Sequence, residues 1–140
     1  MYFTHFKGEA ALRDLLGQLE TYWDEFQALG SICVEANVRV HHPLTHDNFL
    51  VGEAARVDLL PADGRSALWL LSKDPIAWRS ELRMPLLQQW LATRLGSPPS
   101  EIDVGFYFVN AGHYESHSFT DAEIEAAAGE VVQLVARGVS

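Results

Sequence analysis

The sequence predicts an α+β domain: a single mixed sheet of about five strands flanked by three helices, in the order α-βββ-α-ββ-α. Two observations predict this class. Apolar residues recur with a helical period near both ends of the chain and in its middle, and with the two-residue period of strands in between. The chain has 140 residues, the size of one domain, so we expect residues 1–140 to fold as a single unit.

The first helix is expected over residues 8–29, because apolar side chains fall on one stripe at spacings of three, four and seven residues. The stripe consists of Leu12, Leu15, Leu16, Leu19, Trp23 and Phe26. Gly30 follows the last turn, where a residue with positive φ is favoured. One face of this helix must therefore be buried against something, most simply a sheet.

Three strands follow, and we expect them to form an antiparallel meander. Residues 32–40 alternate, which places one set of side chains on one face: Ile32, Val34, Ala36, Val38 and Val40. A turn over residues 41–48 leads to a second strand over about residues 49–60, and a turn at 61–64 leads to a third at 67–71. The third strand is apolar on both faces, which predicts a central strand covered on both sides.

The second half of the chain predicts a helix, two strands and a last helix. The helix is expected over residues 79–95; Pro85 marks its first turn or a kink, and Gly96 ends it. The strands are expected over residues 102–110 and 113–118. Thr120 and Glu123 have the form of a capping box for the last helix, which Gly138 ends. Its inner face is predicted to be Ile124, Ala128, Val131, Val132 and Val135.

Composition and charge exclude several classes of protein. Ten basic residues against nineteen acidic ones give a formal charge of −9, so we do not expect direct nucleic-acid binding. No stretch approaches the roughly 20 apolar residues that a membrane span needs, and residues 1–7 do not resemble a secretion signal. The single cysteine, Cys33, cannot form an internal disulfide, which fits a reducing compartment. We therefore expect a cytoplasmic protein.

Histidine and cysteine chemistry do not predict a metal site or a cofactor. Three histidines and an acid gather in the first turn: His41, His42, His46 and Asp47. Pro43 keeps them off a regular helical face, so we interpret the group as a solvated turn. His113 and His117 share a strand face without further ligands. Cys33 has no neighbouring base that would make a thiolate, so we interpret it as a half-buried strand residue. Gly-rich phosphate loops, Gly-x-Ser-x-Gly and Cys-x-x-Cys are absent from the sequence.

The aromatic residues suggest a small-molecule site as one hypothesis. Trp23, Trp69 and Trp90 fall on predicted core stripes. Trp78 lies in a loop, and we interpret it as a cap on the core, the alternative being an exposed ring that stacks on a flat ligand. In a ligand site the candidate lining residues are Trp78, Tyr107 and Tyr114, with acids such as Glu35 selecting a cationic ligand.

Several short motifs are shared with one nuclease family. They comprise Glu35 in the first strand, the segments Gly52–Asp58 and Leu71–Lys73, the helix start Met84–Leu87 and the strand Val104–Phe108. From about Leu12 to Val135 the chain resembles the RecB/AddB-type nuclease domain of the PD-(D/E)XK superfamily. That family holds Mg²⁺ through carboxylates at positions that Ala55 and Leu71 occupy here. The resemblance thus implies a vestigial site of Glu35, Asp58 and Lys73 with no catalytic residue, because hydrocarbon side chains cannot ligate Mg²⁺.

Three hypotheses of function follow. The resemblance implies a non-catalytic nuclease-like interaction or scaffold module, in a DNA-processing or defence complex, with a protein partner or self-association. The alternative is a small-molecule-binding α+β domain that prefers apolar or cationic ligands. A third is an enzyme with an unrecognised site, for which Glu35, Asp58 and Lys73 would be the residues to mutate.

Overall fold

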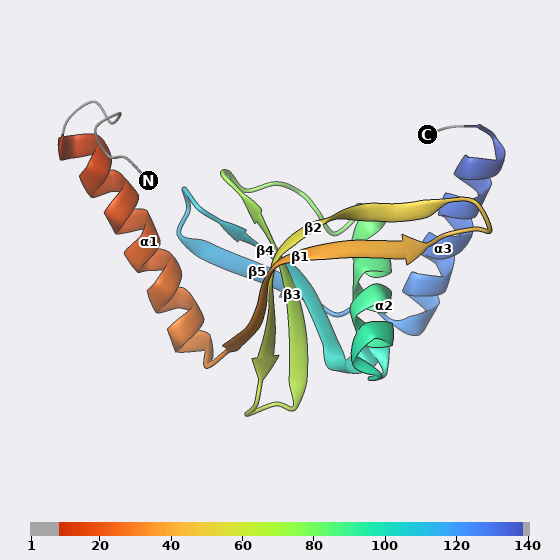
Figure 1. Cartoon of the computed structure of the whole chain (residues 1–140), viewed down its shortest axis with the longest axis horizontal. Helices are drawn as coiled ribbons and strands as arrows, with labels where there is room; N and C mark the ends of the chain where they lie inside the picture. Colours follow the sequence, from red (N-terminus) through yellow and green to blue (C-terminus); the bar gives the residue numbers. More distant parts are fainter. Residues whose placement is uncertain (1–8, 139–140) are drawn as a thin grey trace.

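The computed structural model describes residues 9–138, and Figure 1 shows how the elements are arranged. The helices are α1 (Glu9–Leu29), α2 (Arg83–Leu95) and α3 (Asp121–Ala136), with a short 3₁₀ helix, η2 (Pro99–Glu101). The strands are β1 (Ile32–Pro43), β2 (Phe49–Leu60), β3 (Arg65–Ser72), β4 (Ile102–Phe108) and β5 (His113–His117). This confirms the predicted order α-βββ-α-ββ-α. Residues 1–7, considered above as a secretion signal, lie outside the described range.

The five strands form one mixed sheet in the order β1-β2-β3-β4-β5. The pairs β1–β2, β2–β3 and β4–β5 are antiparallel, which confirms the predicted meander, whereas β3 and β4 are parallel. A parallel pair needs a crossover connection, and α2 supplies it. The central place of β3 confirms the prediction from its apolar faces.

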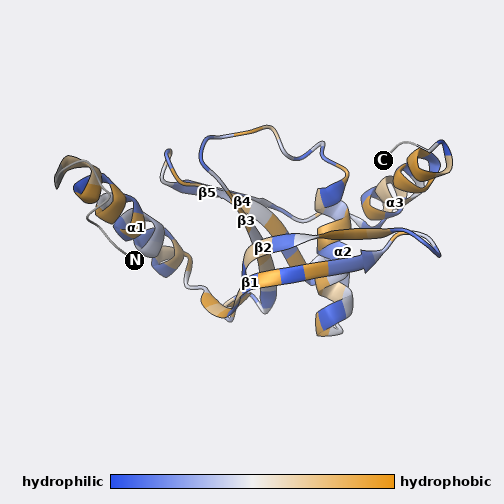
Figure 2. Ribbon diagram, turned by 45° about the horizontal axis from the view of Figure 1, so that its top comes forward, coloured by the Kyte–Doolittle hydropathy of each residue, from blue (hydrophilic) through white to orange (hydrophobic). Residues whose placement is uncertain are grey.

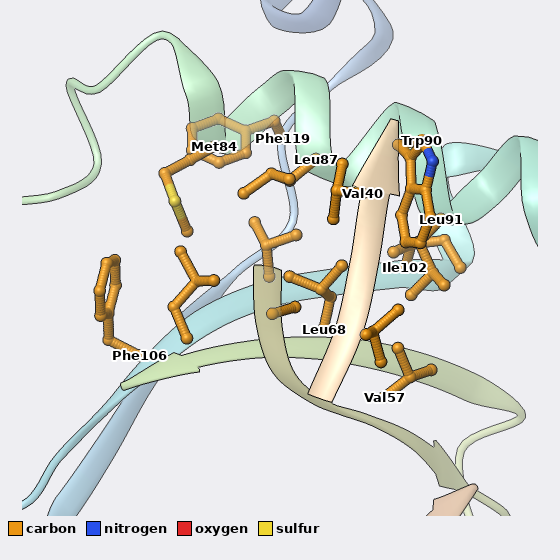
Figure 3. Close-up of a cluster of buried hydrophobic side chains, with 14 of the residues drawn as sticks. Val40, Val57, Leu68, Met84, Leu87, Trp90, Leu91, Ile102, Phe106 and Phe119 are labelled. Atoms are coloured by element: carbon orange, nitrogen blue, oxygen red, sulfur yellow. The ribbon is translucent and has the colours of Figure 1, made fainter. Parts of the chain in front are cut away.

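The face of the sheet covered by α2 and α3 holds the larger core (Figure 3). Its most completely buried side chains include Leu68, Met84, Leu91, Ile102 and Val104. Burial of several such side chains, at about 1.5–3 kcal/mol each, is what attaches the two helices to the sheet. Trp78 is also buried here, and its Nε1 donates a hydrogen bond to Glu115 Oε1 at 3.0 Å. This confirms the interpretation of Trp78 as a cap on the core.

The ends of α2 and α3 follow local chemistry. α2 begins at Arg83 rather than Arg79, so Pro85 lies in its first turn, where a missing N–H costs little. Gly96 ends the helix at φ 68°, and its N–H caps the last carbonyls. Thr120 and Glu123 form the predicted capping box of α3. The expected inner face of α3 is wrong at Val132, which is exposed.

β1 and β2 make a long hairpin whose alternation is interrupted. The register of β1 shifts between Cys33 and Glu35, and Asn37 has a φ of 52°. A bulge changes which face the following side chains take. Val38 and Val40 are accordingly buried, whereas Ile32 and Val34 are exposed. Ala36 is exposed as well, so the prediction of one continuous inner face over residues 32–40 is wrong at its first three apolar positions.

α1 lies on the opposite face of the sheet from α2 and α3, and it projects from the body of the domain (Figure 1). It attaches to the smaller core through Tyr22, Phe26 and Leu29, which pack with Trp69 and Tyr107. The expected stripe is therefore only partly buried. Of its members Phe26 is buried, Leu12 and Leu15 are half-buried, and three face solvent: Leu16, Leu19 and Trp23.

Candidate functional site

An apolar ridge on α1 is the main unexplained feature of the described surface. Leu16, Leu19 and Trp23 have exposed fractions of 53%, 55% and 65%. Their spacing of three and four residues puts them side by side along the helix. Scattered exposed apolar residues are ordinary, but three large ones side by side make this face of α1 a candidate contact surface. We call these three residues the α1 ridge; the helix that carries it is the one drawn apart from α2 and α3 in Figure 2.

An aromatic cluster and one arginine hold α1 in place beside the ridge. The Tyr22 ring meets the Tyr107 ring edge-on at 4.9 Å, and Phe26 meets Trp69 in the same way at 5.4 Å. The Arg56 guanidinium lies 4.0 Å from the Phe26 ring centroid and donates to Tyr22 Oη at 3.1 Å. Cation–π contact and hydrogen bonding therefore fix the orientation of the helix on the sheet. That orientation leaves the ridge facing outward.

The same Arg56 neutralises a buried acid. Asp58 is fully buried on the α1 side of the sheet, and its Oδ1 accepts from Arg56 Nε at 2.7 Å. Burial of Arg56 opposes its positive charge, but the hydrogen bonds to Asp58 and Tyr22 outweigh that effect and raise its pKa. A buried carboxylate needs such a partner, which is why the pair has a structural role.

A first hollow lies between α1 and the sheet and has a volume of about 380 Å³. Its lining comes from α1, from the bend in the β1–β2 hairpin, and from β3 and β4. The lining residues are Leu15, Gln18, Leu19, Tyr22, Ala36, Asn37, Ala55, Leu71, Tyr107 and Val109. None of these ten carries a carboxylate, and most are apolar. The hollow is therefore suited to an apolar group.

A second hollow of about 420 Å³ lies further along α1, where the chain turns into β1. It is lined by Trp23, Phe26, Gln27, Ser31, Ile32, Cys33 and Arg56. Cys33 is exposed there rather than half-buried as expected. Together the α1 ridge and the two hollows form one continuous region, which we call the α1–β1 surface.

The three residues of the predicted vestigial site are not brought together. Glu35 reaches α2, where its Oε1 accepts from Arg94 Nη2 at 2.9 Å. Asp58 lies on the other face of the sheet with Arg56, and Lys73 is an exposed residue just after β3. Glu35 and Asp58 therefore cannot share one metal ion. Among the described residues, no group of three or more His, Cys, Asp or Glu could hold a metal.

Ala55 and Leu71, the positions matched to the metal-binding acids of the nuclease family, do meet. Both line the first hollow, from β2 and from β3, and Leu71 is 52% exposed. Lys73 is not in that lining. The two hydrocarbon side chains thus contribute to an apolar surface at the place where the sequence resemblance would put oxygen ligands.

The candidate ligand-binding aromatics are separated by the sheet. Tyr107 and Tyr114 are directly opposite each other in the β4–β5 pair, on the α1 side. Trp78 is buried in the core on the other face, so the three do not line one pocket. Tyr107 borders the first hollow, and its Oη has no hydrogen-bond partner among the described residues. Burial, with Glu25 and Tyr22 nearby, raises the pKa of this hydroxyl, so it is neutral and can donate.

His41 and His42 lie at the end of β1 rather than in the turn as expected, whereas His46 lies in the turn. His41 stacks on Phe49 at 4.5 Å between ring centroids, and His46 lies 3.9 Å from Asp47 with both side chains exposed. Burial lowers the pKa of His42, which keeps its ring neutral. His113 and His117 contact the rings of Phe108 and Phe119. These contacts are those of packing residues.

No protein-family model matches the chain, and no curated protein matches it. Across residues 9–138, none of the helices combines the length and the apolar character that crossing a bilayer requires. The nuclease resemblance stays a prediction that depends on the short motifs given above.

Proposed function

We propose that this domain is a non-catalytic interaction module that binds a partner protein through the α1–β1 surface. The observation that carries this proposal is the exposed α1 ridge together with the two hollows beside it. Leu19 lines the first hollow, and Trp23 lines the second. Large apolar side chains of this kind are stabilised when a partner removes them from water, and aromatic anchors dominate the energetics of protein interfaces.

The placement of the acids supports the non-catalytic part of the proposal. Glu35 and Asp58 each accept from an arginine on opposite faces of the sheet. Neither is an unpaired carboxylate near the first hollow, whose described lining has no carboxylate. Metal-assisted hydrolysis and acid–base catalysis both need such groups to converge on one point. We also propose, from the sequence motifs, that the module is related to the nuclease family and acts in a DNA-processing or defence complex.

The test is a partner whose binding maps to the ridge. The wild-type chain is used to capture proteins from its source cells; a captured protein is identified, made separately and titrated calorimetrically. We expect Leu19→Gln combined with Trp23→Gln to weaken binding by about 30-fold or more, as loss of a central anchor does. Leu95→Gln combined with Val132→Gln, which changes exposed apolar residues of α2 and α3, should leave affinity unchanged. Equal affinity for both double variants would refute the proposal.

One observation favours a second candidate function, binding of a small apolar molecule. The first hollow, at about 380 Å³, is within the size range of ligand pockets, and the buried Tyr107 Oη beside it has no described partner. A ligand with an apolar body and one hydrogen-bond acceptor would use both features. Glu35 lies on the other face, so it does not select a cationic ligand here. A thermal-shift screen should then find ligands whose stabilisation is lost in Tyr107→Phe.

A further inference from the structure

We propose that the partner segment bound at the α1–β1 surface is a cationic amphipathic helix. This inference rests on the proposed function and adds the chemistry of the partner. Two independent features carry it: the spacing of the two hollows along α1, and the charge that borders the α1 ridge.

The spacing of the hollows matches a helix that lies alongside α1. On α1 the first hollow is lined by residues 15, 18, 19 and 22 and the second by residues 23, 26 and 27, so the middles of the two linings are about seven residues apart. Seven residues of helix rise about 10.5 Å. Positions i and i+7 of a second helix have the same separation and point to the same side. A partner helix can therefore place one apolar anchor in each hollow while the residues between the anchors pack on Trp23 and a neighbouring turn reaches Leu16.

The charge beside the ridge selects a basic partner. α1 contains five acids, at positions 9, 14, 20, 24 and 25, against one basic residue, Arg13. Glu20 and Asp24 are exposed, and each follows a ridge residue by one position, which places them along the solvent-facing border of the ridge. Four of the arginines elsewhere are already paired with acids: Arg56, Arg65, Arg83 and Arg94.

The same charge argues against a second copy of this chain as the occupant. Two copies joined through α1 would bring two acidic helices together, in a protein whose formal charge is already −9. Lysine or arginine residues along one side of a partner helix would instead meet Glu20 and Asp24. Such pairs at the rim of an interface increase the association rate and the selectivity for the partner.

The test uses two synthetic helical peptides and the full chain. Both peptides carry leucines with the i, i+3 and i+7 spacing; one has lysines beside them and the other has glutamates. Binding is followed by fluorescence anisotropy of the labelled peptides. We expect the lysine peptide to bind about tenfold or more tightly than the glutamate peptide at low salt, and this ratio to fall as salt is raised.

Charge reversal provides the decisive variant. Glu20→Lys combined with Asp24→Lys should invert the preference between the two peptides. The matched control, Glu125→Lys combined with Glu130→Lys, changes two exposed acids of α3 by the same total charge and should leave the preference unchanged. An inverted preference in both double variants would mean that only net charge matters, and the inference would be wrong.

Further outcomes separate this inference from the proposed function. Equal binding of the two peptides, abolished by Trp23→Gln, would overturn the cationic partner while the interaction surface stands. Failure of both peptides to bind would likewise overturn the inference, since the proposed function is judged on the captured partner. Sedimentation of the chain alone tests for a dimer. A dimer that dissociates in Trp23→Gln would show that a second copy occupies the surface, and would also overturn the inference.

Discussion

Truncation of two leucines distinguishes the exposed ridge from the core. Leu19 is 55% exposed in α1, whereas Leu70 is buried at 8% among the residues under α2. Full burial of a leucine contributes about 1.5–3 kcal/mol, and Leu19 buries less than half of its surface, so Leu19→Ala should cost about 1 kcal/mol or less. Leu70→Ala should cost about 2–5 kcal/mol, because it removes buried methyl groups and leaves a cavity.

The assay is urea unfolding of both variants at several protein concentrations. The midpoints give the two costs if the dependence on denaturant is unchanged. The helical stripe alone predicts that Leu19→Ala lowers the free energy of unfolding as much as a change in the core does. The structure corrects that expectation, because Leu19 is exposed. A Leu19→Ala variant as destabilised as Leu70→Ala would refute the reasoning, since the ridge would then be covered in the isolated protein.

Three further predictions concern the fold. Gly105→Ala should unfold the domain or cost several kcal/mol (about the upper end of single-site effects), because an added Cβ would meet the backbone oxygen of Glu115 on β5. Gly129 has open space around it in α3, so Gly129→Ala should instead add about 0.5–1 kcal/mol of stability in the same thermal melts. Gln88→Leu should cost about 1–3 kcal/mol in denaturant midpoint, since its buried amide bonds the Phe119 N–H and C=O. Hydrogen bonds from Thr120, first from its backbone N–H, lower the pKa of Glu123. The stability that results is present above pH 4.5, the ordinary pKa, and is lost as pH falls through the lowered value. Acid titration of Glu123→Gln should therefore lack this part of the loss of stability.

Much of the fold could be predicted from sequence because local chemistry and the apolar pattern agreed. The capping box at Thr120, the glycine at 96 and the doubly apolar β3 each had a physical reason that the structure confirms. The alternation of β1 failed at Ile32, Val34 and Ala36, which are exposed. The strand shifts register after Cys33 and takes a positive φ at Asn37, and the alternating pattern does not announce where such irregularities occur.

The candidate site was harder to predict. Periodicity shows that the stripe containing Leu19 and Trp23 will be buried, but it does not show what buries it. The structure shows that the sheet of the same chain contacts α1 through Phe26 of that stripe and through the neighbouring Tyr22. This contact leaves three members of the stripe exposed: Leu16, Leu19 and Trp23. The stripe has the width that is usual for a helix packed on one side, so the residue types give no signal of which part stays exposed. The order of the motifs predicts that Glu35 and Asp58 lie together. The register of β1 on β2 instead puts them on opposite faces of the sheet.

Acrylamide quenching of tryptophan fluorescence tests the central claim most directly, because Trp23 is the exposed indole at 65% while Trp69, Trp78 and Trp90 are buried. The account predicts strong quenching of the wild type, loss of most of it in Trp23→Phe, and protection of the wild type when the lysine peptide is added. Quenching that is weak in the wild type, or equal in Trp23→Phe, would show that the apolar ridge on α1 is already covered, and would contradict the account.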